Sequence, residues 1–227
     1  MKHLKKAHVL FLSSWYPSKI GPTNGNFIEH QARAISLKNK VTILYAIGSS
    51  RITKSEIEKT NNDDILTVII YIKKHKLNII NSIRKTKVLF QTLREIDSFD
   101  IIHANITYPI GLIAWFISIL KKKPFIISEH WSAFLKESNI KFTFFQKIIL
   151  KFVLKKAQYI IPVSQKLKKE MLAKNLRGNY KVIGNVIDTN LFLPTPKKNK
   201  RFTITHISSF EDSSKNISGI LNVIKKL

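Results

Sequence analysis

The sequence contains no cysteine among its 227 residues. This excludes disulfides, cysteine-ligated zinc, iron–sulfur clusters and thiol nucleophiles, and it favours a reducing compartment. A long apolar run is also missing. The longest, Ile110–Leu120, is followed directly by three lysines, and it is shorter than the roughly 20 residues that a helix needs to cross a bilayer. We therefore expect a buried helix at these positions.

The N-terminus lacks the apolar segment of a signal peptide, because its only early run is Val9–Leu12. A cytoplasmic location is therefore expected. Acidic residues are scarce, with 14 Asp and Glu against 39 Lys and Arg, which gives a net charge of +25. Such a charge favours anionic partners, including nucleic acid, acidic lipid and phosphorylated ligands. Coding bias in an AT-rich genome gives the same composition, and the sequence leaves both explanations open.

Several well-known site motifs are absent. The sequence has no G-x-G-x-x-G after its first apolar run, no P-loop, no G-x-S-x-G elbow and no HExxH. A D-x-D metal clamp is missing as well, and we interpret the acidic stretch Asn61–Asp64 as a solvated polar turn. Any catalytic or binding residues must therefore be spread along the sequence and not gathered in one of these short motifs.

Short apolar runs alternate with longer amphipathic stretches along most of the chain, which predicts a doubly wound α/β fold with a parallel sheet buried on both faces. The hydrophilic stretch 51–64 is expected to be a loop. Strands are expected at His8–Ser13, Val41–Ala46, Ile65–Ile72, Asp100–Ala104, Pro124–Ser128, Tyr159–Val163 and Tyr180–Ile183. Helices are expected at Phe27–Lys38, Ile79–Ile96, Ile110–Leu120, Phe142–Lys156 and Gln165–Lys174.

The composition changes near the C-terminus. Residues 193–200 contain two prolines and no apolar periodicity, which predicts a linker after a first domain of residues 1–192. Residues 201–227 then supply one strand, Arg201–Ile207, and a helix from Lys215. Because one strand and one helix cannot bury a core, we expect an incomplete second domain, whether as a fragment or as a truncated gene product.

Ligands bind at the carboxyl ends of the strands in open α/β sheets. After the first expected strand, Gly25 and Asn26 lead into a helix, whose N-terminal amides suit a phosphate that glycine allows to come close. Polar residues also follow the later strands. They are His103, Glu129, His130, Ser164, Asn185 and Asp188.

In order, these segments form a series: SSWYPSKIGPTNGNFIEHQARAI, DIIHAN, PFIISEHWSAF, YIIPVSQKLKKEM, VIGNVIDTNLF and HISSFEDSSKNISGIL. The series resembles family 4 of the retaining glycosyltransferases, which have the GT-B fold. Its most specific parts are the SEH turn, the VS-Q-x-L pattern, and NVID followed by Phe192-x-Pro194. The resemblance covers essentially the whole chain.

The resemblance implies two Rossmann-like domains that hold an acceptor and a nucleotide-sugar donor, without a metal. The acceptor would be a surface glycan or its lipid-linked precursor. Gly25 and Asn26 match the loop that approaches the donor phosphates, and His130 matches the histidine at the reaction centre. Ser164 and Asn185–Asp188 match motifs that border the cleft. Lys215 matches the lysine that neutralises the donor diphosphate, as a fixed cation would.

Two departures from the family pattern weaken the donor site. The usual glycine–arginine pair reads Ser208-Ser209, and the paired glutamates of the donor domain would lie beyond Leu227. We therefore expect the chain as given to be inactive. Alternative hypotheses are a nucleotide-sugar epimerase and a noncatalytic acceptor- or membrane-binding remnant. Only the positive net charge suggests nucleic-acid binding. The sequence has no known nucleic-acid recognition motif, so we do not expect this function.

Two features allow more than one interpretation. His103 fits a structural role as well as a place in the cleft, because histidines at strand ends are often structural. The basic, aromatic stretch Lys141–Lys156 could lie on an anionic membrane. We expect instead that its phenylalanines face the sheet and its lysines face water.

Overall fold

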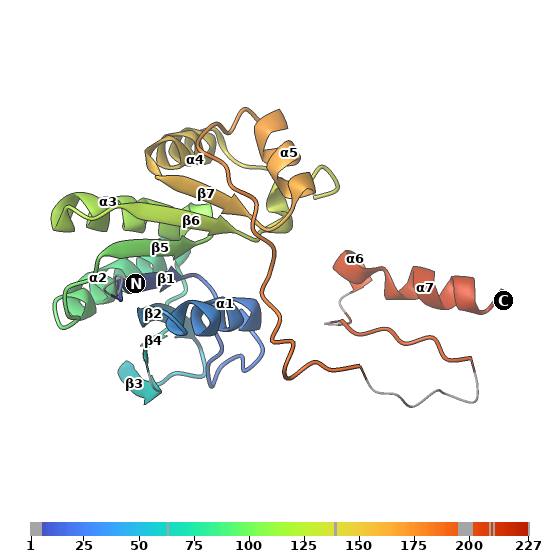
Figure 1. Cartoon of the computed structure of the whole chain (residues 1–227), viewed down its shortest axis with the longest axis horizontal. Coiled ribbons are helices and arrows are strands. Elements are labelled where there is room, and N and C mark those ends of the chain that lie inside the picture. Colours follow the sequence, from blue (N-terminus) through green and yellow to red (C-terminus); the bar gives the residue numbers. More distant parts are fainter. Residues whose placement is uncertain are drawn as a thin grey trace, which may run out of the picture. The chain divides into compact units, whose positions relative to one another are not determined.

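The computed structural model describes residues 6–62, 64–138, 140–194, 202–208, 210 and 212–226. The chain divides into two compact units, Met1–Asp188 and Thr189–Leu227. The first unit contains the sheet and the helices that cover it, and the second contains two short helices (Figure 1). Each unit is described by itself.

The first unit is built on a seven-stranded sheet with the order β3-β4-β2-β1-β5-β6-β7 (Figure 1). Neighbouring strands are parallel, except that β3 is antiparallel to β4. This confirms the predicted α/β class. The strands are β1 His8–Ser13, β2 Lys40–Ser49, β3 Glu56–Asn62, β4 Ile65–Lys73, β5 Ile101–Asn105, β6 Phe125–Glu129 and β7 Tyr159–Pro162.

Helices cover both faces of this sheet. Alternate strand residues point to opposite faces, and apolar residues on each face are buried by these helices. In β1, Leu10 and Leu12 belong to one buried cluster, whereas Val9 and Phe11 belong to another. The second cluster packs against α1, and the first packs against the other helices, so the fold is doubly wound. The helices of this unit are α1 Asn26–Ser36, α2 Asn78–Leu93, α3 Leu112–Lys121, α4 Phe144–Lys156 and α5 Gln165–Ala173, with a π-helical turn η1 Thr107–Gly111 and a 3-10 turn η2 Ser132–Phe134.

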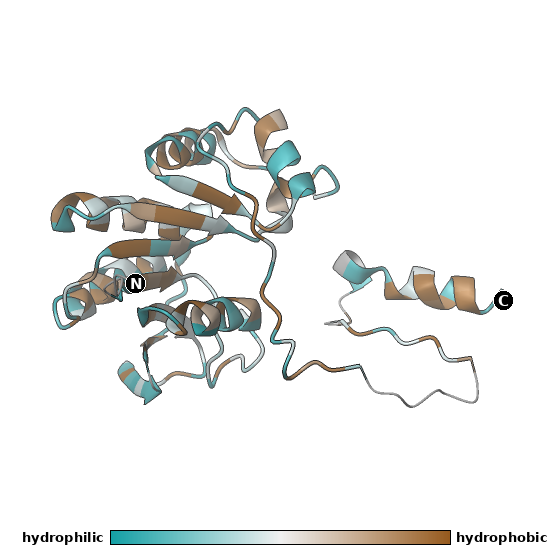
Figure 2. Cartoon of the chain, in the orientation of Figure 1, coloured by the Kyte–Doolittle hydropathy of each residue, from teal (hydrophilic) through white to brown (hydrophobic). Residues whose placement is uncertain are grey.

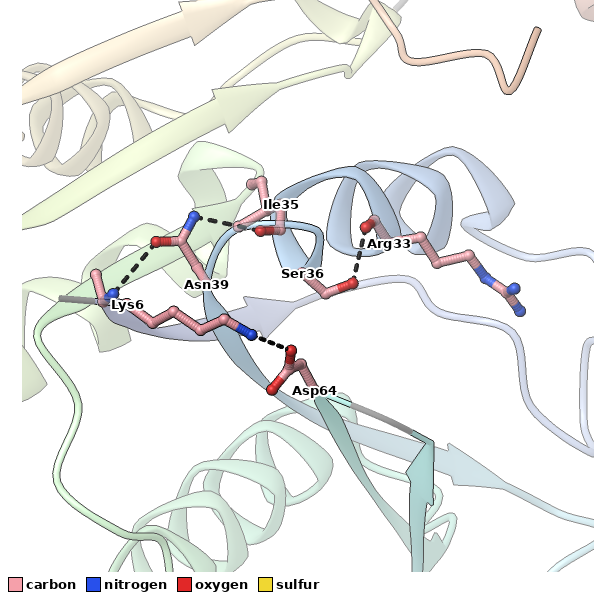
Figure 3. A network of polar contacts seen from close by, with 7 residues as sticks. Lys6, Arg33, Ile35, Ser36, Asn39 and Asp64 are labelled. Atoms are coloured by element: carbon pink, nitrogen blue, oxygen red, sulfur yellow. Dashed lines mark hydrogen bonds and ion pairs between the residues drawn. The ribbon is translucent and has the colours of Figure 1, made fainter. Parts of the chain in front are cut away.

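Polar side chains fix the end of α1 and the start of β2 (Figure 3). The Asn39 amide donates to the Ile35 carbonyl at 3.2 Å and accepts from the backbone N–H of Ala7 at 3.3 Å. Ser36 donates to the Arg33 carbonyl at 2.8 Å. These bonds satisfy carbonyls near the end of the helix and join it to the segment that enters β1.

The expected polar loop at 51–64 is wrong over half of its length. Residues Glu56–Asn62 form β3, whose described side chains are exposed and which pairs only with β4. A strand at the edge of a sheet needs no apolar face of its own, because its partner supplies the backbone hydrogen bonds. Asn61 and Asn62 are therefore strand residues, not the solvated turn that we expected.

Two predicted helices expose more apolar surface than expected. On α2, Leu89 and Leu93 are buried, but Ile79 and Ile83 are exposed. On α3, Ala114 and Ile117 face the core, whereas Phe116, Ile119 and Leu120 are exposed. The prediction of a fully buried helix at 110–120 is therefore wrong, because only one side of α3 meets the sheet.

The expected seventh parallel strand, Tyr180–Ile183, is only an isolated bridge from Tyr180 to Ile160. Backbone bonds continue as far as Ile183, whose N–H donates to the Pro162 carbonyl at 3.3 Å. The side chains of residues 180–183 alternate between half-buried and exposed, so this segment buries too little apolar surface to stabilise a regular strand.

The second unit differs from its prediction. Residues 202–207 form no strand in the described part of this unit. The single helix expected from Lys215 is replaced by α6 Asp212–Lys215 and α7 Ile217–Ile224, separated at Asn216 with φ 50°. Of the expected linker, Leu193 and Pro194 are exposed coil, and 195–200 lie outside the described residues, as does Ser209.

Candidate functional site

The loop after β1 ends at Gly25, which lies immediately before α1. Its φ of 71° is in the left-handed region that favours glycine. A Cβ at this position would also come within 2.7 Å of the Trp15 carbonyl group. The Gly25 carbonyl accepts from the N–H of Ile28 at 2.8 Å and starts the helix. Asn26, the first residue of α1, is exposed beside the free amides of the first turn.

The turn after β6 is organised around the fully buried carboxylate of Glu129. One carboxylate oxygen accepts from Thr107, from the backbone N–H at 2.9 Å and from the hydroxyl at 2.6 Å. The other accepts from the backbone N–H groups of His130 and Trp131, at 3.0 and 2.9 Å. Burial raises the pKa of this carboxyl, and the hydrogen bonds oppose that shift. Glu129 therefore joins the ends of β5 and β6.

His130 follows this carboxylate and packs its ring against Phe27 of α1, with a centroid distance of 4.6 Å. Burial lowers the pKa of His130 to about 4, so the imidazole is neutral at physiological pH. The Asn185 amide approaches the ring and opposes this shift, but the contact misses good hydrogen-bond geometry. Within the described part of the chain, neither ring nitrogen has a hydrogen-bond partner. The ring is therefore a buried polar group whose hydrogen-bonding capacity is unsatisfied in the described structure.

His103 lies deeper than His130, in β5, and its ring packs on Phe11 at 4.4 Å. Its Nε2 lies 2.7 Å from the Ser128 hydroxyl, which also accepts from Gln31 Nε2 at 3.3 Å. Burial, with a smaller contribution from His130, lowers the pKa of His103 to about 3. This neutral histidine connects β5, β6 and α1 beneath the ring of His130.

Three other predicted residues lie around the end of β7. Ser164 is the N-cap of α5, and its hydroxyl accepts from the N–H of Leu167 at 3.1 Å. Asn185 belongs to the segment that leaves β7 and approaches His130. Asp188 is exposed at the end of the first unit. The structure therefore brings Gly25, Asn185 and His130 to the same edge of the sheet, whereas Ser164 has a local structural role.

Lys215 is exposed at the end of α6 in the second unit. A short turn holds this region, because Asp212 accepts from the backbone N–H and the hydroxyl of Ser218, both at 2.8 Å. Its role at a donor diphosphate stays a prediction.

Sequence reasoning missed Asn105 and Thr107. Asn105, the last residue of β5, is fully buried, and neither atom of its amide has a partner among the described side chains and backbone groups. Thr107 supplies two of the hydrogen bonds to Glu129. Both follow the DIIHA run that marked His103, so their position at a strand end was the available signal.

In the ranges that the structure describes, no group of three or more His, Cys, Asp or Glu side chains could hold a metal ion. The same ranges contain no helix that is both long and apolar enough to span a membrane. The polar groups that the structure describes at the carboxyl edge of the sheet are histidines, hydroxyls, amides, helix N-terminal N–H groups and the buried Glu129 carboxylate.

The sequence matches the model of Glycosyltransferase Family 4 over residues 26–191, a range that contains α1 and the whole turn around His130. The chain belongs to glycosyltransferase family 4. This confirms the resemblance drawn from the sequence motifs. A search of curated proteins found no match.

Solved structures place the fold in the GT-B class. Sucrose-phosphate synthase from Thermosynechococcus elongatus aligns with a TM-score of 0.59 at 13% identity, covering 83% of this chain. Trehalose-6-phosphate synthase from E. coli, bound with UDP-2-fluoro glucose, aligns with 0.53 at 10% identity over 82%. UGT89C1 from Arabidopsis thaliana, complexed with UDP, aligns with 0.51 at 12% identity over 81%. The chain covers 50% of each of these three chains.

Proposed function

We propose that this family 4 protein transfers a sugar from a nucleotide-sugar donor to a surface glycan or its lipid-linked precursor, with retention at the anomeric carbon. The observation that carries the proposal is His130, a neutral imidazole without a protein partner among the described residues, next to the Gly25 loop. The family match over residues 26–191 supports transfer chemistry, and the UDP ligands of two structural neighbours support a nucleoside diphosphate sugar.

In this proposal His130 is a hydrogen-bonding group that orients the transferred sugar. A neutral imidazole donates one hydrogen bond and accepts another, which matches a sugar hydroxyl better than it matches a phosphate. Glu129 is too deeply buried to attack the sugar, and its hydrogen bonds fix the backbone of His130. It acts as a positioning residue.

The donor diphosphate is proposed to lie at the first turn of α1, where Asn26 is exposed, and Gly25 allows the loop to enter this turn because a Cβ would meet the Trp15 backbone. Free N–H groups at a helix N-terminus and the associated dipole favour an anion. Lys215 is the proposed cation for the leaving diphosphate, which gains charge as the glycosidic bond breaks. No metal is required in this scheme.

The test is a transfer assay with the protein expressed from its native gene, a set of UDP- and GDP-sugars, and lipid-linked acceptors. Release of nucleoside diphosphate that depends on the acceptor supports transfer. H130A is expected to lower the rate about 100-fold, as for loss of one oriented hydrogen-bonding group. Gln158→Ala, an exposed change outside this edge, is the control. Wild-type rates in H130A would contradict the site, and epimerised donor without acceptor would point to an epimerase.

We further propose that the protein works at the cytoplasmic face of an anionic membrane through one side of α4. On that side, Phe144 and Phe145 are 73% and 75% exposed. The expectation that the phenylalanines of this helix face the sheet is wrong for both. The helix begins only after Thr143, whose hydroxyl accepts from the N–H of Gln146 at 3.3 Å, and its core-facing side carries Leu150, Val153 and Leu154.

Basic residues border this apolar side. Lys147, Lys151 and Lys155 are exposed on the same helix, and no acidic residue occurs within it. Figure 2 shows hydrophobic and hydrophilic residues together on α4. Exposed phenylalanines flanked by lysines fit a bilayer with anionic headgroups, because the rings enter the interface and the ammonium groups meet the phosphates.

Vesicle sedimentation tests this surface. The double variant F144S/F145S is expected to weaken binding to phosphatidylglycerol vesicles at least about tenfold, since each buried Phe contributes about 2 kcal/mol. L37S is the matched control, because Leu37 is an isolated apolar residue, 81% exposed beyond α1. Equal binding by the wild type and the double variant would overturn the membrane proposal without affecting the transfer proposal.

A further inference from the structure

Two adjoining cavities lie at the carboxyl edge of the sheet, on the face opposite α1. One, of about 220 Å³, is lined by the ends of β1 and β2, by α2 and by the segment that enters α3. The other, of about 330 Å³, lies between the end of β2 and the first turns of α2. Ser82 and Lys85 line both cavities, so the two spaces meet at these side chains.

Two lysines line the cavity of about 330 Å³ between β2 and α2, and the fold fixes both. Lys85 comes from the second turn of α2. Lys74 follows β4, and its N–H donates to the Ser49 carbonyl at 3.2 Å. The next residue is clamped by Asn81, which accepts from the His75 N–H at 2.7 Å and donates to its carbonyl at 2.8 Å. The position of Lys74 is therefore set by β2 and α2 together.

The charge of these lysines is not balanced within the cavities. No carboxylate appears among the described residues that line either one. Burial lowers the pKa of Lys85, and the neighbouring charge of Lys74 lowers it further. Holding two cations together in a partly desolvated space costs free energy, and a bound anion would offset that cost.

Hydroxyl groups complete the environment. Ser14 and Thr86 line the cavity of about 220 Å³, and the Ser14 hydroxyl is buried without a partner in the described structure. The Ser13 hydroxyl also lines this cavity, but it already donates to the Trp15 carbonyl. Such groups donate to the oxygens of a phosphate or bind the hydroxyls of a sugar. The opposite wall is apolar and consists of Leu89, Ile110 and Ile113.

We propose that these two cavities bind the phosphate of a phosphorylated acceptor, with Lys85 and Lys74 on the phosphate and Ser14 on the adjoining sugar. The inference rests on the proposed transferase function. The geometry agrees with it, because Ser13, Asn105 and Ser128 are register partners on neighbouring strands. The end of β1 is therefore about 10 Å, two strand spacings, from the end of β6 that carries His130.

The experiment is calorimetric titration of the full chain with two probes. Glucose 1-phosphate represents a soluble sugar phosphate, and geranyl diphosphate represents a lipid-linked diphosphate. Tighter binding of either probe than of glucuronate supports the proposal. The probe that binds more tightly shows whether the phosphate belongs to a soluble sugar phosphate or to a lipid-linked diphosphate. Glucuronate is the anionic comparison, and equal affinity for glucuronate would overturn recognition of phosphate.

Three variants locate the binding. Lys85→Met retains the apolar stem and is expected to raise the Kd at least about tenfold, as for loss of a charged hydrogen bond. Lys74→Met changes an exposed side chain, so it tests the same site without a risk to folding. Lys87→Met is the matched control, because Lys87 is exposed on the same helix and lines neither cavity; its Kd should stay within about twofold.

An equal loss of affinity in all three variants would show nonspecific charge attraction and would overturn the site, as would wild-type affinity in both Lys85→Met and Lys74→Met. The titration requires no sugar transfer. If the wild type binds glucose 1-phosphate but transfers no sugar in any assay, the pocket stands and the transferase proposal fails.

Discussion

Polar groups usually lie on a protein's surface and large apolar groups in its interior. The turn after β6 and the outer side of α4 both depart from this rule, but in opposite ways. The turn buries the Glu129 carboxylate and part of the His130 ring beside the buried His103 of β5, whereas the helix exposes phenylalanines to solvent. Buried polar groups and exposed large apolar groups are the informative departures in a folded protein. The polar turn is stabilised internally by hydrogen bonds, but nothing in the described chain covers the outer side of α4. The buried polar turn is therefore stabilised by the fold itself, whereas the exposed apolar side of α4 is a surface suited to an external partner.

The largest expected effect tests the interior of the turn. E129A removes the acceptor of four hydrogen bonds and leaves the N–H groups of Thr107, His130 and Trp131 without it. The free energy of unfolding should fall by about 3–5 kcal/mol. Urea denaturation measures this. E129Q keeps the shape and should lose less, and a loss below about 1 kcal/mol in E129A would mean that the turn does not depend on the carboxylate.

A second prediction tests the glycine loop that faces this turn. G25A should lower the free energy of unfolding by about 1–3 kcal/mol, because Ala at φ 71° is strained and its Cβ meets the Trp15 backbone. G184A is the control, since a Cβ there would meet only the Val163 carbonyl, at 4.0 Å. Thermal unfolding of both variants compares them. Equal melting temperatures would remove the argument that glycine is required at position 25.

The pH dependence of stability tests the neutral state of His130. Its folded pKa of about 4 lies below the ordinary value of 6.5, so the unfolded chain binds the proton more tightly. Stability is therefore complete above pH 6.5 and is lost as the pH falls toward 4, by an amount on the order of 2 kcal/mol. H130N lacks this contribution and should show a flatter profile between pH 7 and 4. Parallel profiles for the two proteins would contradict the burial of the ring as the cause.

The smallest expected effect concerns the outer side of α4. F144S/F145S should change the free energy of unfolding by less than about 0.5 kcal/mol, because both rings are already exposed. F134A, at a fully buried position nearby, should cost about 3–5 kcal/mol in the same urea titration. If the double variant lost as much stability as F134A, the rings would be packing residues and the contrast between the two regions would disappear.

The strands that carry the site were predictable from the sequence. β1, β5 and β6 are short apolar runs, and their carboxyl ends lead to the residues that the family motifs marked, so the order of residues alone indicated Gly25, His103, Glu129 and His130. The edge strand β3 was missed because its pattern carries no apolar alternation and it forms only by pairing with β4.

The sequence by itself determined the alternation of strands and helices, the parallel sheet and the family, because periodicity and motif order are local properties of the chain. The tertiary structure alone decided which polar groups meet. Glu129 bonds Thr107 from another strand end, and Lys74 meets Lys85 across a loop held by Asn81. It also decided which side of α4 is exposed, since that depends on where the helix starts and on the sheet against which Leu150, Val153 and Leu154 pack. Burial and charge balance arise from such contacts between distant segments, and they explain the neutral histidines and the two lysines that no carboxylate of the described cavity lining balances.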